Sequence, residues 1–197
     1  MTTRRTCTTL TRLVAVAAAL VAWLAMAAEA SAATNTFQGP GDQWNAAGNW
    51  SQASVPDATD DVVIPSSRAV VLDTTAGEAN SLDLDGQLHV SGTSLTLGAG
   101  TSSIGGSLQI TGGGTVALSA VTTWSGGGIS FGGGGGTLHV GAGDVLGITG
   151  ADLVSLNFGG GLWRNDGTVN RTTSATTAQI GVPFENDGAV NVNTGTL

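Results

Sequence analysis

The two histidines of the chain are its clearest candidates for chemistry, because His89 and His139 share the local sequence Gly-x-Leu-His-Val. Two outward imidazoles on equivalent strands could bind a metal or act as an acid–base pair. Neither histidine has a cysteine or a carboxylate at a spacing typical of metal ligands. Their separation of 50 residues is not a multiple of the repeat of about 21 residues described below. We therefore predict two solvent-facing strand residues, no metal site and no cofactor.

Carboxylates are the next candidates for chemistry. Asp83-Leu84-Asp85-Gly86 resembles the start of a calcium loop, but the residues that follow supply no further series of oxygen ligands. Asp73, Asp83 and Asp85 could also share one face with Arg68, and a glycosidase needs two carboxyl groups about 5 to 10 Å apart. Alternation with leucines explains these aspartates as the solvent side of a strand, so we predict no catalytic residue. A polysaccharide lyase or hydrolase is kept as an alternative.

Two tryptophans could bind a sugar. Trp44 and Trp50 lie six residues apart in a glycine-rich segment, and an exposed indole can stack on a pyranose ring. Large aromatic side chains in such a segment are more often buried. We predict that both rings cover the end of the folded core, and we keep a carbohydrate-binding module that uses them as a second alternative.

The N-terminal residues have the three-part layout of a secretory signal peptide. A basic leader precedes an uncharged stretch over residues 13–28, which ends near the A-x-A site Ala30-Ser31-Ala32. The uncharged stretch is shorter than the roughly 18 to 20 residues of a membrane-spanning helix. We predict a signal peptide over residues 1–32, exported by general secretion or the twin-arginine route, and a secreted or surface-exposed mature chain without a membrane span.

Cleavage would remove the single cysteine, Cys7, and three of the six basic residues. The mature chain would then hold three arginines and no lysine against thirteen acidic residues, a net charge of −10. Nucleic acids and anionic lipids attract the opposite sign, so neither is an expected partner. Without disulfides, stability must come from buried apolar surface and backbone hydrogen bonds.

The elements that must position these side chains are short strands. SLDLDGQLHVSG, GSLQIT, GTVALS and GTLHVG all alternate apolar and polar residues between glycines, a pattern typical of half-buried strands. Leu88 and Leu108 are 20 residues apart, Val116 and Leu138 are 22 apart, and WRNDGTVN recurs as FENDGAVN after 21. Self-similarity at this period predicts an all-β solenoid, a parallel β-helix with about 20–22 residues per coil.

The corners of the coils explain the glycine content. Eight glycines lie between residues 126 and 136, and we interpret them as closely spaced corners around the short strand Ile-Ser-Phe. In the last two repeats, Asn165 and Asn186 should form an asparagine ladder, while Gly167 and Gly188 complete the turns at positive φ. Arg171 occupies an apolar phase, so that strand should end at Asn170.

The ends of the array differ. Residues 33–64 show no echo of the repeat and hold both Trp44 and Trp50, so they are predicted to form an N-terminal capping segment, followed by coils over 65–197. The C-terminal residues read like the start of another strand. We expect either a longer array beyond the given C-terminus or self-association through an open last coil that exposes Val190 and Val192.

The motifs W-x4-N-W-x5-P-x3-D-x-V-V-I (from Trp44), TWSGGGISFGGGGGTLHVGAG and N-x-G-x-V together resemble the β-strand-repeat proteins that bacteria secrete. These are similar to autotransporter passengers and filamentous adhesins. The resemblance implies a right-handed parallel β-helix at the cell surface and carries over no catalytic residue.

We therefore predict a secreted, non-catalytic structural or adhesive segment of a bacterial surface protein. Its expected partners are glycans or cell-surface polymers, contacted through many weak polar interactions.

Overall fold

The computed structural model describes residues 31–150, 153–156, 160–172 and 177–197. The chain divides into two units, residues 1–31 and 32–197, and the fold described below is that of the second. The predicted signal peptide lies almost wholly outside the described residues. Within the described part of the chain, no helix is both long and apolar enough to cross a membrane.

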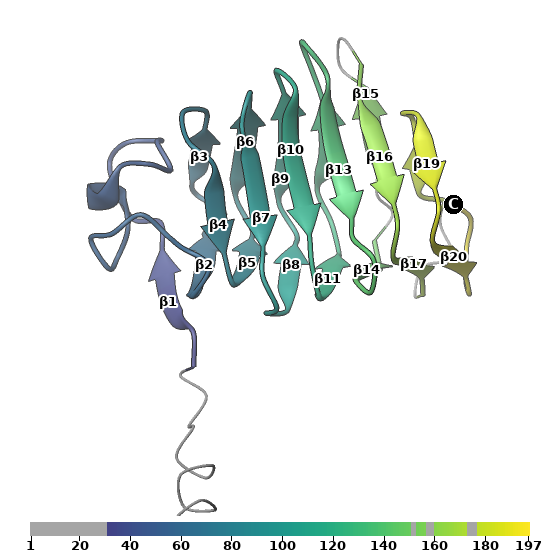
Figure 1. Cartoon of the computed structure of the whole chain (residues 1–197), viewed down its shortest axis with the longest axis horizontal. Helices are drawn as coiled ribbons and strands as arrows, with labels where there is room; N and C mark the ends of the chain where they lie inside the picture. Colours follow the sequence, from purple (N-terminus) through teal and green to yellow (C-terminus); the bar gives the residue numbers. More distant parts are fainter. Residues whose placement is uncertain (1–30, 151–152, 157–159, 173–176) are drawn as a thin grey trace, which may run out of the picture. The chain divides into compact units, whose positions relative to one another are not determined.

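The described residues of the second unit form three parallel sheets (Figure 1). Sheet 1 has the order β1 (Ala33–Thr36), β2 (Asp60–Ile64), β5 (Ser81–Leu84), β8 (Ser102–Ile104), β11 (Val121–Trp124), β14 (Val145–Ile148), β17 (Thr168–Arg171) and β20 (Ala189–Val192). Sheet 2 consists of β3 (Ala69–Leu72), β6 (Gln87–Ser91), β9 (Ser107–Thr111), β12 (Gly128–Phe131), β15 (Leu153–Leu156) and β18 (Gln179–Ile180). Sheet 3 consists of β4 (Gly77–Ala79), β7 (Ser94–Leu97), β10 (Gly114–Leu118), β13 (Gly136–Val140), β16 (Leu162–Asn165) and β19 (Phe184–Asn186).

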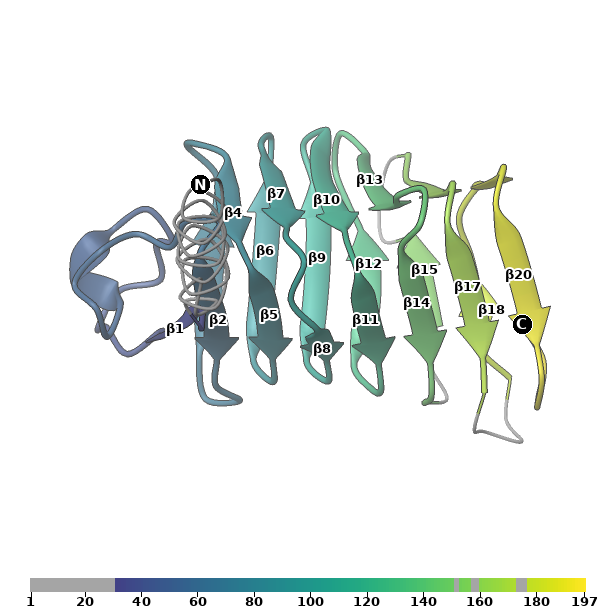
Figure 2. The same cartoon turned by 60° about the horizontal axis from the view of Figure 1, so that its bottom comes forward.

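Each coil contributes one strand to each sheet in turn, from β2–β3–β4 to β17–β18–β19 (Figure 2). The connection between parallel neighbours therefore runs through the other two sheets, which is the topology of a solenoid. The structure confirms the predicted right-handed parallel β-helix with an N-terminal capping segment. The step between paired residues ranges from 18, between Val70 and Leu88, to 26, between Val154 and Ile180.

Alternation along the strands builds the core. In β6, Leu88 and Val90 point inward and are fully buried, while the residues between them face outward. All three predicted registers are confirmed: Leu88 pairs with Leu108, Val116 with Leu138, and Trp163 with Phe184. Like residues thus stack on like residues through the molecule, and their burial drives folding.

The glycine-rich stretch is a pair of corners, as predicted. The short strand β12 lies between turns at 125–127 and 132–135. Gly127, Gly134 and Gly135 have positive φ, a conformation that glycine adopts without steric cost.

The corners after β16 and β19 use glycine for a different reason. Gly167 and Gly188 do not belong to the described glycines with positive φ, so the predicted reason for them is wrong. A Cβ at Gly188 would lie 2.1 Å from the carbonyl oxygen of Gly167, and one at Gly167 would lie 2.3 Å from that of Gly141. The backbones of successive coils approach so closely here that only glycine fits.

The first coil begins earlier than the sequence indicates. We placed its start at residue 65, but β2 (Asp60–Ile64) already pairs with β5 in sheet 1, and β1 pairs with β2. The alternation of Asp60–Ile64, buried at every second residue, is that of a coil strand. The capping segment is therefore residues 37–59, with the short 3-10 helix η1 (Ala47–Asn49).

The strand β17 includes Arg171, which the sequence placed beyond its end. Arg171 is fully buried and pairs with Ile148 on one side and Val192 on the other. Its Nη1 donates a hydrogen bond to the carbonyl oxygen of Gly150. A buried guanidinium group requires such acceptors, and a corner of the neighbouring coil supplies one.

Candidate functional site

The structure places the two histidines on different faces. His89 lies on β6 of sheet 2, and His139 lies on β13 of sheet 3. Gln109 pairs with His89, while Arg164 pairs with His139. The two imidazoles therefore belong to separate surroundings and form no joint site.

The carboxylates and Arg68 are engaged separately. Ser103 Oγ donates a hydrogen bond to Asp83 Oδ1 across neighbouring coils. Arg68 donates to the carbonyl oxygens of Gln38 at 2.9 Å and Gly39 at 3.1 Å, so it ties the capping segment to the first coil. No group of three or more His, Cys, Asp or Glu residues that could hold a metal occurs among the described residues.

Trp44 and Trp50 pack inside the capping segment. Their exposed fractions are 0% and 3%, and their ring centroids lie 5.0 Å apart in an edge-to-face arrangement. Trp50 Nε1 donates to the carbonyl oxygen of Trp44 at 2.6 Å, and Phe37 packs edge-on against Trp50. Buried rings offer no face to a sugar, so the alternative that these two indoles bind glycans is wrong for this structure.

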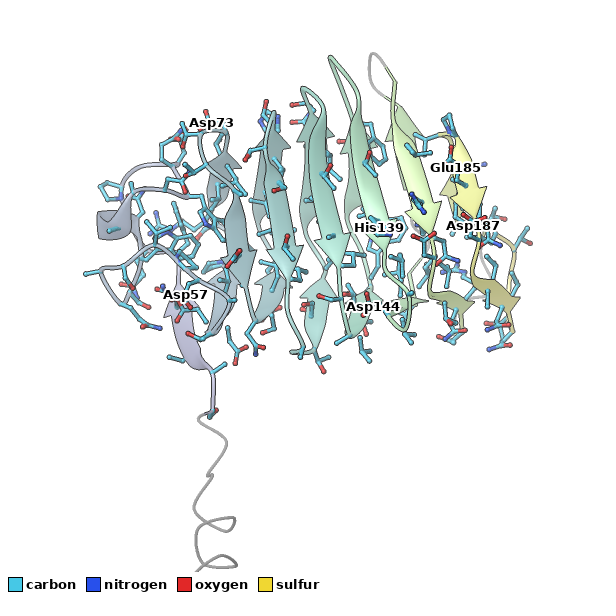
Figure 3. All side chains as sticks on the ribbon, viewed as in Figure 1. Asp57, Asp73, His139, Asp144, Glu185 and Asp187 are labelled. Carbon is cyan, nitrogen blue, oxygen red and sulfur yellow. The ribbon has the colours of Figure 1, made fainter. Side chains whose placement is uncertain are left out.

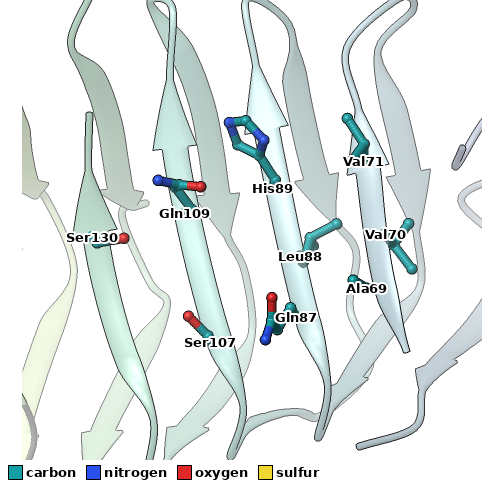
Figure 4. Close-up of a pocket in the computed structure, with 9 residues that line it drawn as sticks. All are labelled: Ala69, Val70, Val71, Gln87, Leu88, His89, Ser107, Gln109 and Ser130. Atoms are coloured by element: carbon teal, nitrogen blue, oxygen red, sulfur yellow. The ribbon is translucent and has the colours of Figure 1, made fainter. Parts of the chain in front are cut away.

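A polar groove crosses the outer face of sheet 2 (Figure 4). It has a volume of about 400 Å³, within the range of small-molecule sites. We call it the sheet-2 groove, and it is lined by Ala69, Val70, Val71, Gln87, Leu88, His89, Ser107, Gln109 and Ser130. No charged side chain is among these lining residues.

Strand register arranges the outward side chains of the groove in two rows. One row is Val71, His89, Gln109 and Ser130, and the other is Ala69, Gln87 and Ser107. Figure 4 shows His89 beside Gln109, with the Gln87 and Ser107 side chains further along the same two strands. The imidazole is fixed because His89 Nε2 shares a hydrogen bond of 2.7 Å with Thr111 Oγ1.

Sheet 3 carries a charged cluster, formed by His139, Arg164 and Asp166 (Figure 3). His139 Nε2 donates to Asp166 Oδ2 at 2.9 Å, and Arg164 Nε lies 3.1 Å from Asp166 Oδ1. The hydrogen bond from His139, followed by that from Arg164, lowers the pKa of the Asp166 carboxyl below its ordinary value. The three side chains satisfy one another, which favours a structural role.

Sequence reasoning missed both surface features. The groove had a readable signal, since Gln87-x-His89 and Ser107-x-Gln109 occupy the same frame 20 residues apart. The charged cluster had none, because His139 pairs with Arg164 across a step of 25 residues, longer than the repeat.

Residues 49–144 match the sequence model of the G8 domain, just under half of the chain. The match begins in the capping segment and contains the strands β2 to β13, including every residue that lines the sheet-2 groove. No curated protein and no solved structure matched the chain. The match and the β-solenoid fold are consistent with an extracellular structural domain.

Proposed function

We propose that the chain is a secreted, non-catalytic structural or adhesive segment of a bacterial surface protein, related to autotransporter passengers and filamentous adhesins. The observation that carries the proposal is the continuous in-register stack of coils, which repeats outward polar side chains on flat faces. Backbone hydrogen bonds on both sides of most strands make such a stack stiff.

The stack provides the mechanism for adhesion. Each coil adds about 4.8 Å, so six coils give a rod of about 30 Å. Outward hydroxyl and amide groups recur at that spacing, and a polymer that contacts several of them gains avidity without one strong contact. The partners proposed are glycans or other cell-surface polymers.

The non-catalytic part of the proposal rests on how the acids are used. Asp83 accepts from Ser103, and Arg68 is bound to the capping segment rather than aimed at a carboxylate pair. A glycosidase or lyase needs acid and base groups that flank a substrate cleft. The sheet-2 groove is instead lined by neutral side chains and one imidazole.

A glycan array combined with assays for reducing ends and unsaturated products tests the proposal. The secreted chain should bind glycans on the array and release no product from them. Product formation would contradict the non-catalytic assignment, and binding that disappears with Trp50→Ala in a folded variant would favour a binding module built on the capping segment.

A further inference from the structure

We propose that the sheet-2 groove binds an uncharged oligosaccharide, with Gln87, His89, Gln109 and the two serines as its hydrogen-bonding groups. This inference rests on the proposed adhesive function and assigns it a site and a ligand class. It follows from the groove's shape, chemistry and rigidity.

The groove's polar groups match the hydroxyls of a sugar. Gln87 and Gln109 each carry a carbonyl acceptor and an NH2 donor, and Ser107 and Ser130 can donate and accept. A sugar hydroxyl also donates and accepts, so each of these groups can pair with it in either sense. The polar groups lie in two rows along the groove, so a ligand with hydroxyls along both edges is favoured.

Charge selects against acidic sugars. The lining residues include no arginine or lysine, and the chain after residue 32 carries a net charge of −10. A uronate or sulfate group would lose its hydration without gaining a cationic partner. A cationic ligand would likewise find no carboxylate among the lining residues. The ligand class that remains is neutral.

One end of the groove is apolar. Ala69 and Val71 on β3 face outward at the start of the two rows. They adjoin the polar part formed by β6 and β9, so the groove is amphipathic. A pyranose has C–H faces as well as hydroxyl edges, and apolar contact with Ala69 and Val71 would cover one such face.

The groove is held in place before a ligand arrives. Its four strands, β3, β6, β9 and β12, are neighbours in one sheet, and Thr111 fixes the His89 imidazole. Three steps between strands span about 14 Å, which fits an oligosaccharide lying along the stack better than a single sugar. A preformed site lowers the entropy lost on binding.

Isothermal titration with cello-, malto- and manno-oligosaccharides, and with an oligogalacturonate as the charged comparator, tests this inference. At least one neutral series should bind, and the oligogalacturonate should not. Gln87→Ala and Gln109→Ala should each weaken binding about tenfold through lost hydrogen bonds, and Ser130→Arg should abolish it by filling the groove. The matched control is Thr123→Ala, an outward polar residue on β11 of sheet 1, which should bind like the native chain.

The outcomes separate the two proposals. Unchanged melting temperatures show that the variants are folded. Binding that survives all three groove substitutions overturns the groove and leaves adhesion standing, and so does a failure of the three neutral series when the glycan array is positive. Preferred binding of the oligogalacturonate overturns the neutral ligand class. Cleavage of a bound oligosaccharide overturns the non-catalytic function, whereas loss of that cleavage in the groove variants would still assign the site.

Discussion

Asn165 stacks directly against Asn186 of the next coil, and its Nδ2 donates to Asn186 Oδ1 at 2.6 Å. The same Nδ2 donates to the carbonyl oxygen of Ala189 at 3.1 Å. A second pair, Asn191 to Asn170 at 2.8 Å, repeats the arrangement on sheet 1. Asparagine side chains therefore join successive coils outside the core as well as at its edge.

The first prediction ranks the members of these ladders. Asn165 is fully buried, so Asn165→Ala removes two hydrogen bonds and should cost roughly 2 kcal/mol of unfolding free energy. Asn186→Ala should cost about 1 kcal/mol, and the exposed Asn191→Ala less. Urea denaturation of the three variants measures the order. Equal, negligible shifts would mean that the ladders contribute nothing to stability.

The second prediction concerns backbone contact between coils. Gly167→Val and Gly188→Val should each destabilise by about 3 kcal/mol or more, because the added carbon would overlap a carbonyl oxygen of the coil beneath. Gly147 on β14 is the matched control, since a Cβ there meets only Thr122 O, at 3.9 Å. Gly147→Ala should be neutral or stabilise by about 0.5–1 kcal/mol. Thermal melts decide, and a similar loss in all three would argue against close approach as the cause.

The third prediction is a pH dependence from the charged cluster. The pKa of Asp166 is lowered in the folded chain, so its interactions with His139 and Arg164 stabilise the fold above the ordinary value of 3.8. That contribution is lost as pH falls through the lowered pKa, below about pH 4. The native chain should have a higher urea midpoint than Asp166→Asn at pH 6, and the difference should vanish near pH 2. A difference that stays constant with pH would exclude titration of Asp166 as its origin.

The fourth prediction concerns the last coil. β18, β19 and β20 each stand at the end of their sheet in the described chain. Val190 and Val192 have the inward phase of their partners Val169 and Arg171, yet Val192 is 47% exposed. We predict that copies of the chain associate through this coil, since unpaired strand edges and apolar tops favour pairing. Light scattering should show mass growing with concentration, and Val190→Asp with Val192→Lys should suppress the growth. A native chain that stays monomeric at every concentration would contradict this.

The sequence predicted the fold because each coil repeats the same physical pattern. Leu88 and Leu108 share a frame, and the corners between them carry glycine, so period and register were both readable. Arg171 was misassigned because charge suggested a strand end, whereas a carbonyl oxygen in a neighbouring coil made its burial possible. The role of Gly188 could not be read either, since the oxygen it avoids belongs to Gly167, 21 residues earlier.

The candidate site was less predictable than the fold. The sheet-2 groove depends on which outward side chains of four strands become neighbours, and its step from Val71 to His89 is shorter than the repeat. The His139–Asp166 pair spans a coil that the period underestimates. Surface chemistry on a solenoid follows register at each step, and a single irregular coil shifts every later neighbour.

The most direct test of the account follows one oligosaccharide in the presence of the protein. A neutral oligosaccharide that binds the secreted chain is incubated overnight with an equal concentration of it, and its length is measured by mass spectrometry. The account predicts saturable binding, lost in Gln109→Ala, with the oligosaccharide unchanged in mass. Shortened or unsaturated products would contradict it and would identify the chain as a polysaccharide-processing enzyme.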